Sequence, residues 1–289
     1  MDDMLHVIAQ VGILAGVFIS MLALGTSVER AQIRASLRQP RLLALALVAN
    51  FVAAPLVALV LIRLLPLSVE GQTALILLGA TAGAPLLPKL AALAGGQRPL
   101  AIGLMVLLML ATVGYAPLVL PLLLPGVAVP AGDIARSLLI TMLLPLAAGL
   151  LARGRYPAVA EWSTELSRIA GASLALGLTA GLLIGWRGLL ATIGSWVIVG
   201  AILLALGATA AGWLLAAGLD PGTRHVAALG AAMRNVSASL LIAGQTFGPQ
   251  TLISTMTATL ALTVALVVVA GEMGRNETAR RRDGETVSR

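Results

Sequence analysis

One interrupted apolar segment decides the fold, and it reads Gly79-Ala80-Thr81-Ala82-Gly83-Ala84-Pro85-Leu86-Leu87-Pro88-Lys89. Two prolines and two glycines within these eleven residues disfavour a continuous helix, because each proline removes a backbone donor and clashes with the preceding turn. Backbone groups released in the middle of a membrane must face protein or a watery cavity, since lipid offers them no hydrogen bond. The segment therefore predicts a transmembrane helix that is broken near its middle.

The composition around this segment is that of an all-α polytopic membrane protein. Of the 289 residues, 59% are hydrophobic and 11% are charged, and apolar stretches of about 20 residues recur along the chain. The ten-residue alternation typical of barrel strands is missing from the sequence, so helices are the spanning elements. The sequence predicts nine transmembrane helices, at residues 5–25, 42–64, 73–94, 100–122, 134–152, 169–186, 195–217, 225–246 and 251–272.

The basic residues predict the orientation of these spans. With the N-terminus outside, fourteen arginines fall in inside segments, and they are Arg30, Arg34, Arg38, Arg41, Arg98, Arg153, Arg155, Arg168, Arg224, Arg275, Arg280, Arg281, Arg282 and Arg289. Only Arg63, Arg136 and Arg187 fall outside. The positive-inside rule then places the N-terminus outside and the basic tail, residues 275–289, in the cytoplasm of a bacterial-type inner membrane. The acidic start of the chain favours a retained first span rather than a signal peptide.

A second irregular segment reads Gly230-Ala231-Ala232-Met233-Arg234-Asn235-Val236-Ser237 and carries a charge near the middle of span eight. In both segments a proline-containing turn, at residues 65–72 or 219–224, precedes an apolar half-helix and then the irregular stretch. Span three runs inward and span eight outward, so the pattern predicts an inverted repeat of spans one to four against six to nine. Paired interrupted spans of this kind indicate a transporter's binding site. Close packing of small residues explains the glycines but not the charges.

Other function classes find little support in the sequence. There is no cysteine, and His6 and His225 lie far apart, so no metal site is predicted. An aromatic content of 3% disfavours nucleic-acid binding despite the net charge of +7. No HExxH motif or paired intramembrane aspartate is present, so the chain is not expected to be an enzyme. The loops are too short for the output domain of a sensor or scaffold, and no pore-lining motif of a channel is present.

Several short stretches resemble the bile acid:sodium symporter family, and together they cover most of the chain. They are Met21-Leu22-Ala23-Leu24-Gly25, Gln39-Pro40-Arg41, Asn50-Phe51-Val52-Ala53-Ala54-Pro55, the segment 79–89 and the segment 234–243. The resemblance implies a ten-helix inverted-repeat fold in which two discontinuous helices cross. It also implies a core bundle at 42–122 and 195–272 and a panel bundle at 5–25 and 134–186. This chain is expected to lack the family's first helix.

The resemblance also indicates where this chain departs from sodium-coupled members. Pro88-Lys89 stands where those members show a Ser-Asn pair in the first broken helix. Gly230 and Arg234 stand where they show Glu and Gln in the second, while Asn235 matches and Asn50 is a candidate amide ligand. No Asp or Glu lies at mid-membrane depth in the predicted spans, although hard cations favour carboxylate oxygens. Sodium coupling in the family's usual form is therefore not expected, and no cofactor is predicted.

These substitutions give a hypothesis for the substrate site. Lys89, the single lysine of the chain, and Arg234 supply positive charge in place of bound cations, and an organic carboxylate would neutralise them. The candidate substrate-binding residues are Lys89, Arg234, Asn235, Thr81, Pro85, Ser237 and Asn50. The alternative for Lys89 is that it snorkels to lipid headgroups.

The predicted function is alternating-access transport of an organic anion, either a bile-acid-like steroid conjugate or a smaller carboxylate. A lysine near another cation has a lowered pKa, so proton coupling through Lys89 and plain uniport both remain open. The alternatives are a sodium-dependent symporter with a rearranged ion site, or a membrane sensor or scaffold without transport. The predicted partners are the anion and membrane lipid.

Overall fold

The computed structural model describes residues 2–124, 131–184 and 195–287, and within these ranges every regular element is a helix apart from one isolated β-bridge. The elements are α1 (Asp2–Ser27), α2 (Arg30–Leu37), α3 (Pro40–Val48), η1 (Ala49–Ala53), α4 (Ala54–Leu64), α5 (Val69–Ala80), α6 (Leu87–Leu93), α7 (Arg98–Leu123), α8 (Ala131–Leu138), η2 (Leu139–Leu143), α9 (Leu144–Arg155), η3 (Pro157–Glu161), α10 (Trp162–Ile184), α12 (Trp196–Leu215), α13 (Pro221–Ala232), α14 (Val236–Thr246) and α15 (Pro249–Val287). The all-α prediction is confirmed. Arg187, Arg289 and the end of the predicted span 169–186 lie outside the described residues.

Six continuous helical stretches in these ranges are long and apolar enough to cross a membrane. They are Met4–Ser27, Pro40–Leu64, Arg98–Leu123, Ala131–Arg155, Trp196–Leu215 and Pro249–Ala279. The predicted spans 73–94 and 225–246 are not continuous helices, because the first is divided into α5 and α6 and the second into α13 and α14. The chain is thus a multi-pass helical membrane protein with two interrupted helices.

The first interruption follows from the local sequence. Ser68 starts α5 by accepting a hydrogen bond from the Gly71 backbone N–H at 3.2 Å, as an N-cap side chain does. The helix ends at Ala80, and Gly83 adopts φ +81°, a conformation that favours glycine. Residues before a proline favour extended backbone, so Pro85 keeps the chain from resuming the helix before α6.

The second interruption is bounded by two N-caps. Asp220 starts α13 by accepting from the Thr223 N–H at 3.0 Å, and the hydrogen bonds from Thr223 hold the pKa of Asp220 below its ordinary value. Asn235 starts α14 by accepting from the Ala238 N–H at 3.0 Å. Between them α13 ends at Ala232, which leaves Met233 and Arg234 in extended backbone that can pair with another segment.

Two of the long stretches contain a π-helical turn. Both turns, η1 and η2, come directly before a helix whose first residues include a proline, Pro55 in α4 and Pro145 in α9. The missing N–H of the proline prevents the regular i→i−4 bond and explains the widened turn. Asn50 lies in η1, so the widened turn positions a candidate site residue.

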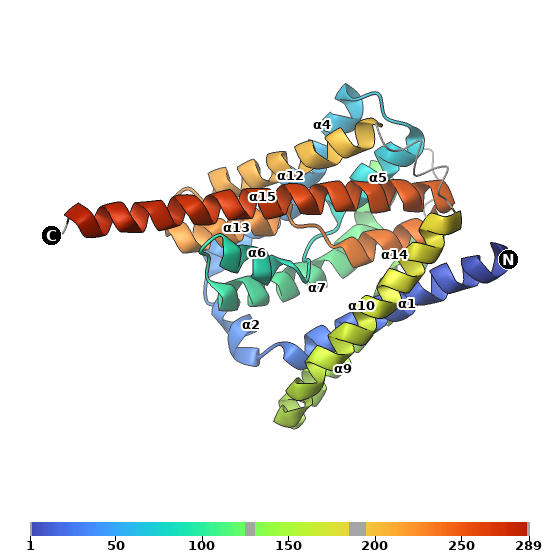
Figure 1. Ribbon diagram of the computed structural model, residues 1–289, viewed down its shortest axis with the longest axis horizontal. Coiled ribbons are helices and arrows are strands. Elements are labelled where there is room, and N and C mark those ends of the chain that lie inside the picture. The colour runs from blue at the N-terminus through green and yellow to red at the C-terminus, as the bar shows by residue number, and fades with distance from the viewer. Residues whose placement is uncertain (1, 125–130, 185–194, 288–289) are drawn as a thin grey trace.

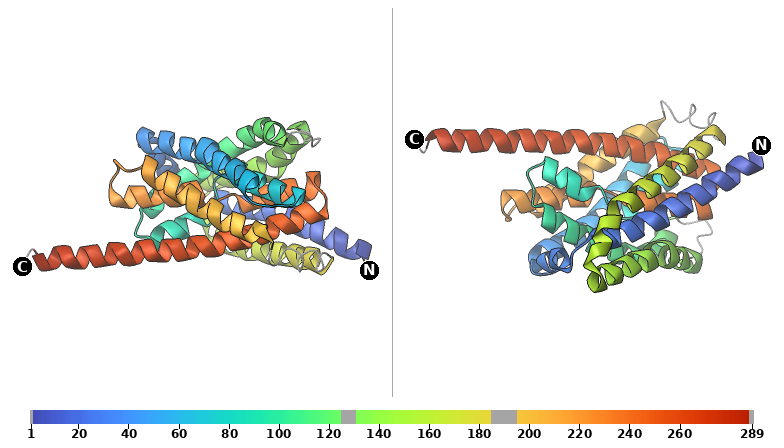
Figure 2. Two further views of the ribbon diagram at one scale, coloured as in Figure 1. Left: turned by 90° about the horizontal axis from the view of Figure 1, so that it is seen from above. Right: turned by 60° about the horizontal axis from the view of Figure 1, so that its bottom comes forward.

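The helices form two groups. In one group α1 packs along α10 and α9, and Figure 1 and the right-hand view of Figure 2 show α1 and α10 running side by side at an angle to α15. Glycines permit this contact, because a Cβ atom on Gly12 would lie 2.7 Å from the Gly177 Cα. In the second group α12 packs on α13 and α15, and α5 packs on α15 and α4.

The structure differs from the predicted spans at two places. The short helix α2 lies in the segment between spans one and two, for which no helix was predicted. The last helix, α15, does not end near residue 272 but continues to Val287, through most of the expected tail at 275–289, and projects beyond the other helices (Figure 1). An ion pair between Arg275 and Glu272, one turn apart, and the absence of proline or glycine from residues 275–283 favour this extension.

We expect Gly83→Ala to destabilise the protein more than Gly114→Ala. A Cβ atom on Gly83 would lie 2.4 Å from the Met109 backbone nitrogen, and the φ of +81° adds strain of about 1–3 kcal/mol. A Cβ atom on Gly114, within α7, meets no described atom within 4 Å, so this control variant should unfold at or above the wild-type temperature. Thermal unfolding of the purified proteins measures both, and equal losses would contradict the expectation.

Candidate functional site

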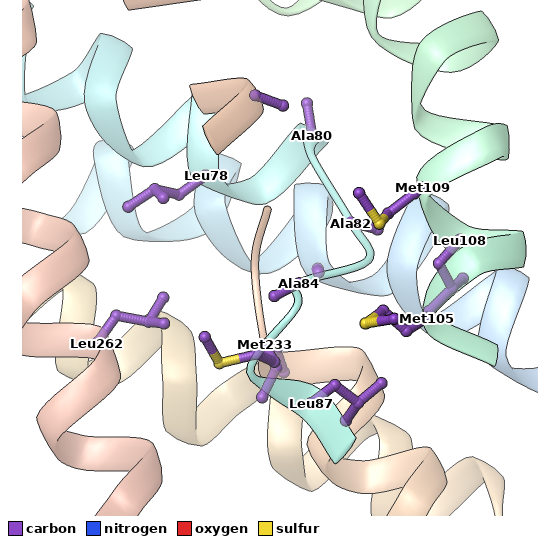
Figure 3. Close-up of a cluster of buried hydrophobic side chains, with 14 of the residues drawn as sticks. Leu78, Ala80, Ala82, Ala84, Leu87, Met105, Leu108, Met109, Met233 and Leu262 are labelled. Atoms are coloured by element: carbon purple, nitrogen blue, oxygen red, sulfur yellow. The ribbon is translucent and has the colours of Figure 1, made fainter. Parts of the chain in front are cut away.

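The two interruptions cross and pair with each other. Ala82 and Arg234 form an antiparallel β-bridge, and the Asn235 N–H donates to the Thr81 carbonyl oxygen at 3.2 Å. Figure 3 shows the extended segment running from Ala80 past Ala82 and Ala84 to Leu87, with Met105 and Met109 of α7 on one side. We refer to the paired residues 81–86 and 233–235 as the crossing. Because the two interruptions are hydrogen-bonded to each other, we expect a movement of one to move the other.

Three hydroxyl groups form hydrogen bonds at the crossing. The Thr81 hydroxyl lies 2.7 Å from the Ser239 hydroxyl and donates to the Leu77 carbonyl at 2.9 Å. The Thr112 hydroxyl, from α7, accepts from the Ala82 N–H at 2.9 Å and lies 3.0 Å from the Ala82 carbonyl oxygen, to which it donates. Thr112 thus replaces both of the helical hydrogen bonds that Ala82 has lost.

The side chain of Arg234 is enclosed at the crossing, with a relative exposure of 0%. Its Nη1 donates to the Gly79 carbonyl at 3.3 Å, and its Nη2 donates to the Asn50 Oδ1 atom. Asn50 is oriented for this role because its Nδ2 donates to the Ala46 carbonyl at 2.9 Å. The Arg234 Nε and the Asn235 Nδ2 are buried donors without a hydrogen-bond partner among the described residues.

The charge of Arg234 is compensated by dipoles. Gly79 lies in the last turn of α5, where the helix dipole concentrates negative partial charge. The ion pairs found in the described ranges, Arg153–Glu29, Arg168–Glu165 and Arg275–Glu272, all lie elsewhere, and no carboxylate there contacts Arg234. An embedded arginine costs roughly 2.5–3.5 kcal/mol on insertion scales, which the carbonyl and amide oxygens offset in part.

The structure brings together part of the predicted site. Thr81, Asn50, Arg234 and Asn235 are all buried and meet at the crossing, and Ser237, with a relative exposure of 9%, lies in the first turn of α14. Three other residues have different surroundings. Pro85 is exposed within the crossing, while Pro88 and Lys89 lie in α6 rather than in the interruption, and the Lys89 side chain is exposed.

Sequence reasoning missed two residues that bond to the crossing, Thr112 and Ser239, and one, Tyr115, that bonds to the neighbouring turn η1. Thr112 and Ser239 bind the backbone of the crossing and Thr81, and the Tyr115 hydroxyl donates to the Phe51 carbonyl of η1 at 2.7 Å. The only signal in the sequence was that these are polar residues inside predicted spans. Many other Ser and Thr residues also lie in predicted spans, where their hydroxyls bond to backbone carbonyls of their own helix. The signal therefore does not single out a site residue.

Comparison with known protein families gives a match over part of the chain. Residues 14–184, more than half of the chain, match the model described as the Sodium Bile acid symporter family. This stretch contains the first interruption and Asn50, while Arg234 and the second interruption lie beyond it. No curated protein matches the chain.

We expect a double-mutant cycle to reveal the pairing of Asn50 with Arg234. Asn50→Leu leaves Nη2 of the buried guanidinium without its acceptor, while Nη1 keeps the Gly79 carbonyl, and should cost about 1.5–3 kcal/mol, as a lost hydrogen bond to a charged group does. The Asn50→Leu/Arg234→Met protein, which removes both groups, should recover most of that loss. Denaturant unfolding in detergent measures these two variants and Arg234→Met alone. Losses that simply add in the double variant would show that the two residues do not act as a pair.

Proposed function

The chain belongs to the sodium bile acid symporter family, and we propose that it is a secondary transporter of an organic anion in which Arg234 takes the place of a bound sodium ion. The observation that carries this proposal is the enclosed guanidinium at the crossing. Membership supports transport by a multi-pass membrane protein, and the buried cation supports the departure from sodium coupling.

The donors and acceptors at the crossing support this role for Arg234. A sodium ion would need several hard oxygen ligands. The Gly79 carbonyl and the Asn50 amide oxygen both already accept from the guanidinium. Gly230, where sodium-coupled relatives are expected to carry Glu, supplies no side-chain oxygen. The residues present therefore do not fit sodium in addition to Arg234, and we derive no transport step through sodium.

The arrangement of helices supports alternating access with nine spans. In this proposal α5 with α6, and α13 with α14, each count as one interrupted span, so that the helices of the described ranges make nine crossings arranged as an inverted repeat. The start of α1 and the end of α15 lie at opposite ends of the molecule (Figure 1), as an odd number of crossings requires. The group of α1, α9 and α10 corresponds to a panel bundle, and the group that holds the crossing corresponds to a core bundle. Rocking between two such bundles is the usual mechanism of repeat-built carriers.

Lys89 is the second cation of the proposed site. Its exposure on the short helix α6 suits either contact with an entering carboxylate or contact with a lipid headgroup. Lys89→Gln separates these roles, because only the first predicts a reduced affinity for the transported anion.

We expect reconstituted protein to take up anions equally well in sodium and in choline buffers. Labelled butyrate and a labelled bile acid serve as probes, and uptake that saturates and accelerates on exchange identifies a carrier. Arg234→Gln removes the fixed charge and should lower uptake by about tenfold or more, while Arg234→Lys keeps the charge and should retain part of it. Sodium-stimulated uptake would instead support a rearranged sodium site, and absence of uptake for a wider set of anions would favour a non-transport role.

We also expect the C-terminal end of α15 to face the cytoplasm. The chain has no cysteine, so single cysteines at Met4 and Asn276 can be introduced without a background. A membrane-impermeant maleimide should label Met4→Cys in intact spheroplasts and Asn276→Cys only after lysis, as the bias of arginines toward one side requires. The reverse pattern would overturn the proposed orientation.

A further inference from the structure

A short helix joins the two groups of helices at one end of the molecule. α2 follows α1 of the first group and precedes α3, which continues through η1 and α4 into the second group. It packs on α7, where the buried Ser36 hydroxyl donates to the Leu100 carbonyl oxygen at 2.9 Å. The contact is close, because a Cβ atom on Gly103 would overlap the Gln32 carbonyl oxygen. One face of α2 is thereby held against α7.

The contacts with α7 give the depth of α2. Leu100 and Gly103 lie in the first two turns of α7, so α2 lies within about 8 Å of the point where that helix begins. In the proposed orientation α7 begins at the cytoplasmic side. Amphipathic helices at a membrane interface lie about 5–10 Å deep, at the boundary of headgroups and acyl chains. We therefore expect α2 at the level of the phosphate groups of the cytoplasmic leaflet.

The face of α2 that points away from α7 is basic. Arg30, Arg34 and Arg38 follow one another at intervals of four residues, and all three are exposed. The helical turn extends to Arg38, since its N–H donates to the Arg34 carbonyl oxygen at 3.0 Å. Leu37 lies on the same face with a relative exposure of 53%. The face thus combines positive charge with an exposed apolar side chain.

The charge of this face is not neutralised within the described residues. The ion pairs found there are Arg153–Glu29, Arg168–Glu165 and Arg275–Glu272, and none includes an arginine of α2. Glu29, the acidic residue next to α2 in the sequence, is paired with Arg153 of α9 at 3.6 Å. The face therefore offers its guanidinium groups to an external anionic group.

Anionic phospholipid matches this face better than a soluble anion does. A phosphodiester group accepts hydrogen bonds from guanidinium groups, and acyl chains at the same depth cover Leu37. A soluble anion would leave Leu37 exposed to water. The positive-inside rule by itself asks only for arginines near the cytoplasm, and it does not require them to share a helix face with an apolar side chain.

We propose that α2 is a binding site for anionic phospholipid of the cytoplasmic leaflet, with headgroup phosphates at Arg34 and Arg38 and with Leu37 among the acyl chains. The inference rests on the proposed orientation but not on the proposed substrate. Because α2 connects the two groups of helices and packs on α7, which carries Thr112 of the crossing, a lipid bound there contacts the connection between them.

Thermal unfolding of the full-length protein in detergent, titrated with phosphatidylglycerol or phosphatidylcholine, tests the proposal. We expect phosphatidylglycerol to raise the unfolding temperature, because a ligand that binds only the folded state stabilises it. Phosphatidylcholine, which has no net charge, should raise it much less. Sodium chloride at about 1 M should reduce the difference, since it shortens the screening length from about 10 Å to about 3 Å. Equal shifts with both lipids would overturn the proposal.

Arg34→Gln/Arg38→Gln should weaken the apparent affinity for phosphatidylglycerol by about tenfold or more, because each arginine near an anionic surface contributes about fivefold. Arg34→Lys/Arg38→Lys keeps both charges and should retain most of the affinity. Arg155→Gln/Arg168→Gln is the matched control, since both residues are exposed and are expected on the same side of the membrane but lie outside α2. Equal losses in the two Gln variants would show a general basic surface and overturn the α2 site.

Two further arms separate lipid from a soluble anion and from the proposed function. Leu37→Ser leaves the charge unchanged and should weaken phosphatidylglycerol binding by about threefold or more, through lost apolar contact. Glycerol phosphate should give no shift, and a shift equal to that of phosphatidylglycerol would overturn the lipid assignment. Lipid binding that persists in protein without anion uptake would support this inference and overturn the proposed function. Anion uptake without any preference for phosphatidylglycerol would do the reverse.

Discussion

The hydrogen-bonding needs of two interrupted helices constrain the whole structure. Each interruption frees backbone amides and carbonyls where lipid or packed side chains surround the chain, and such groups cannot remain unpaired. The crossing answers this need, because Ala82 pairs with Arg234 and the Thr81 carbonyl accepts from Asn235. The Thr112 hydroxyl forms hydrogen bonds with the backbone N–H and carbonyl of Ala82. The two interruptions are therefore stable only together, and the helices around them are arranged to keep them in contact.

The same pairing explains why a charge can be held there. Two half-helices end at the crossing, and the last turn of α5 supplies a carbonyl to Arg234 while Asn50 supplies an amide oxygen. A mobile cation at this place would have to be bound and released in each transport cycle. In the proposed transporter, a tethered guanidinium would hold the same positive potential permanently, and the anion would remain as the species whose binding changes the energy of the crossing.

Helix α14 connects the crossing, at its first residue, to a cavity between α1, α10, α14 and α15, at its last turn. Helix α14 begins at the crossing with its Asn235 cap and ends at Gln245, which the Ser137 hydroxyl of α8 contacts. This hydrogen bond joins the two groups of helices at the point where they enclose the cavity. A ligand that bridges the groups would stabilise one relative position of them, which is the differential binding that a conformational change requires.

The sequence by itself determined the helical membrane class, the two interruptions and the buried charge. Proline, glycine and arginine act on the nearest turns of the chain, so their effects follow from residues 79–89 and 230–237 without knowledge of the fold. The tertiary structure decided the partners. Only packing joins Asn50 to Arg234 and Thr112 to Ala82, exposes Lys89 on α6, and forms a small cavity from α1, α10, α14 and α15. Those contacts depend on how distant helices meet, and no local pattern specifies that geometry.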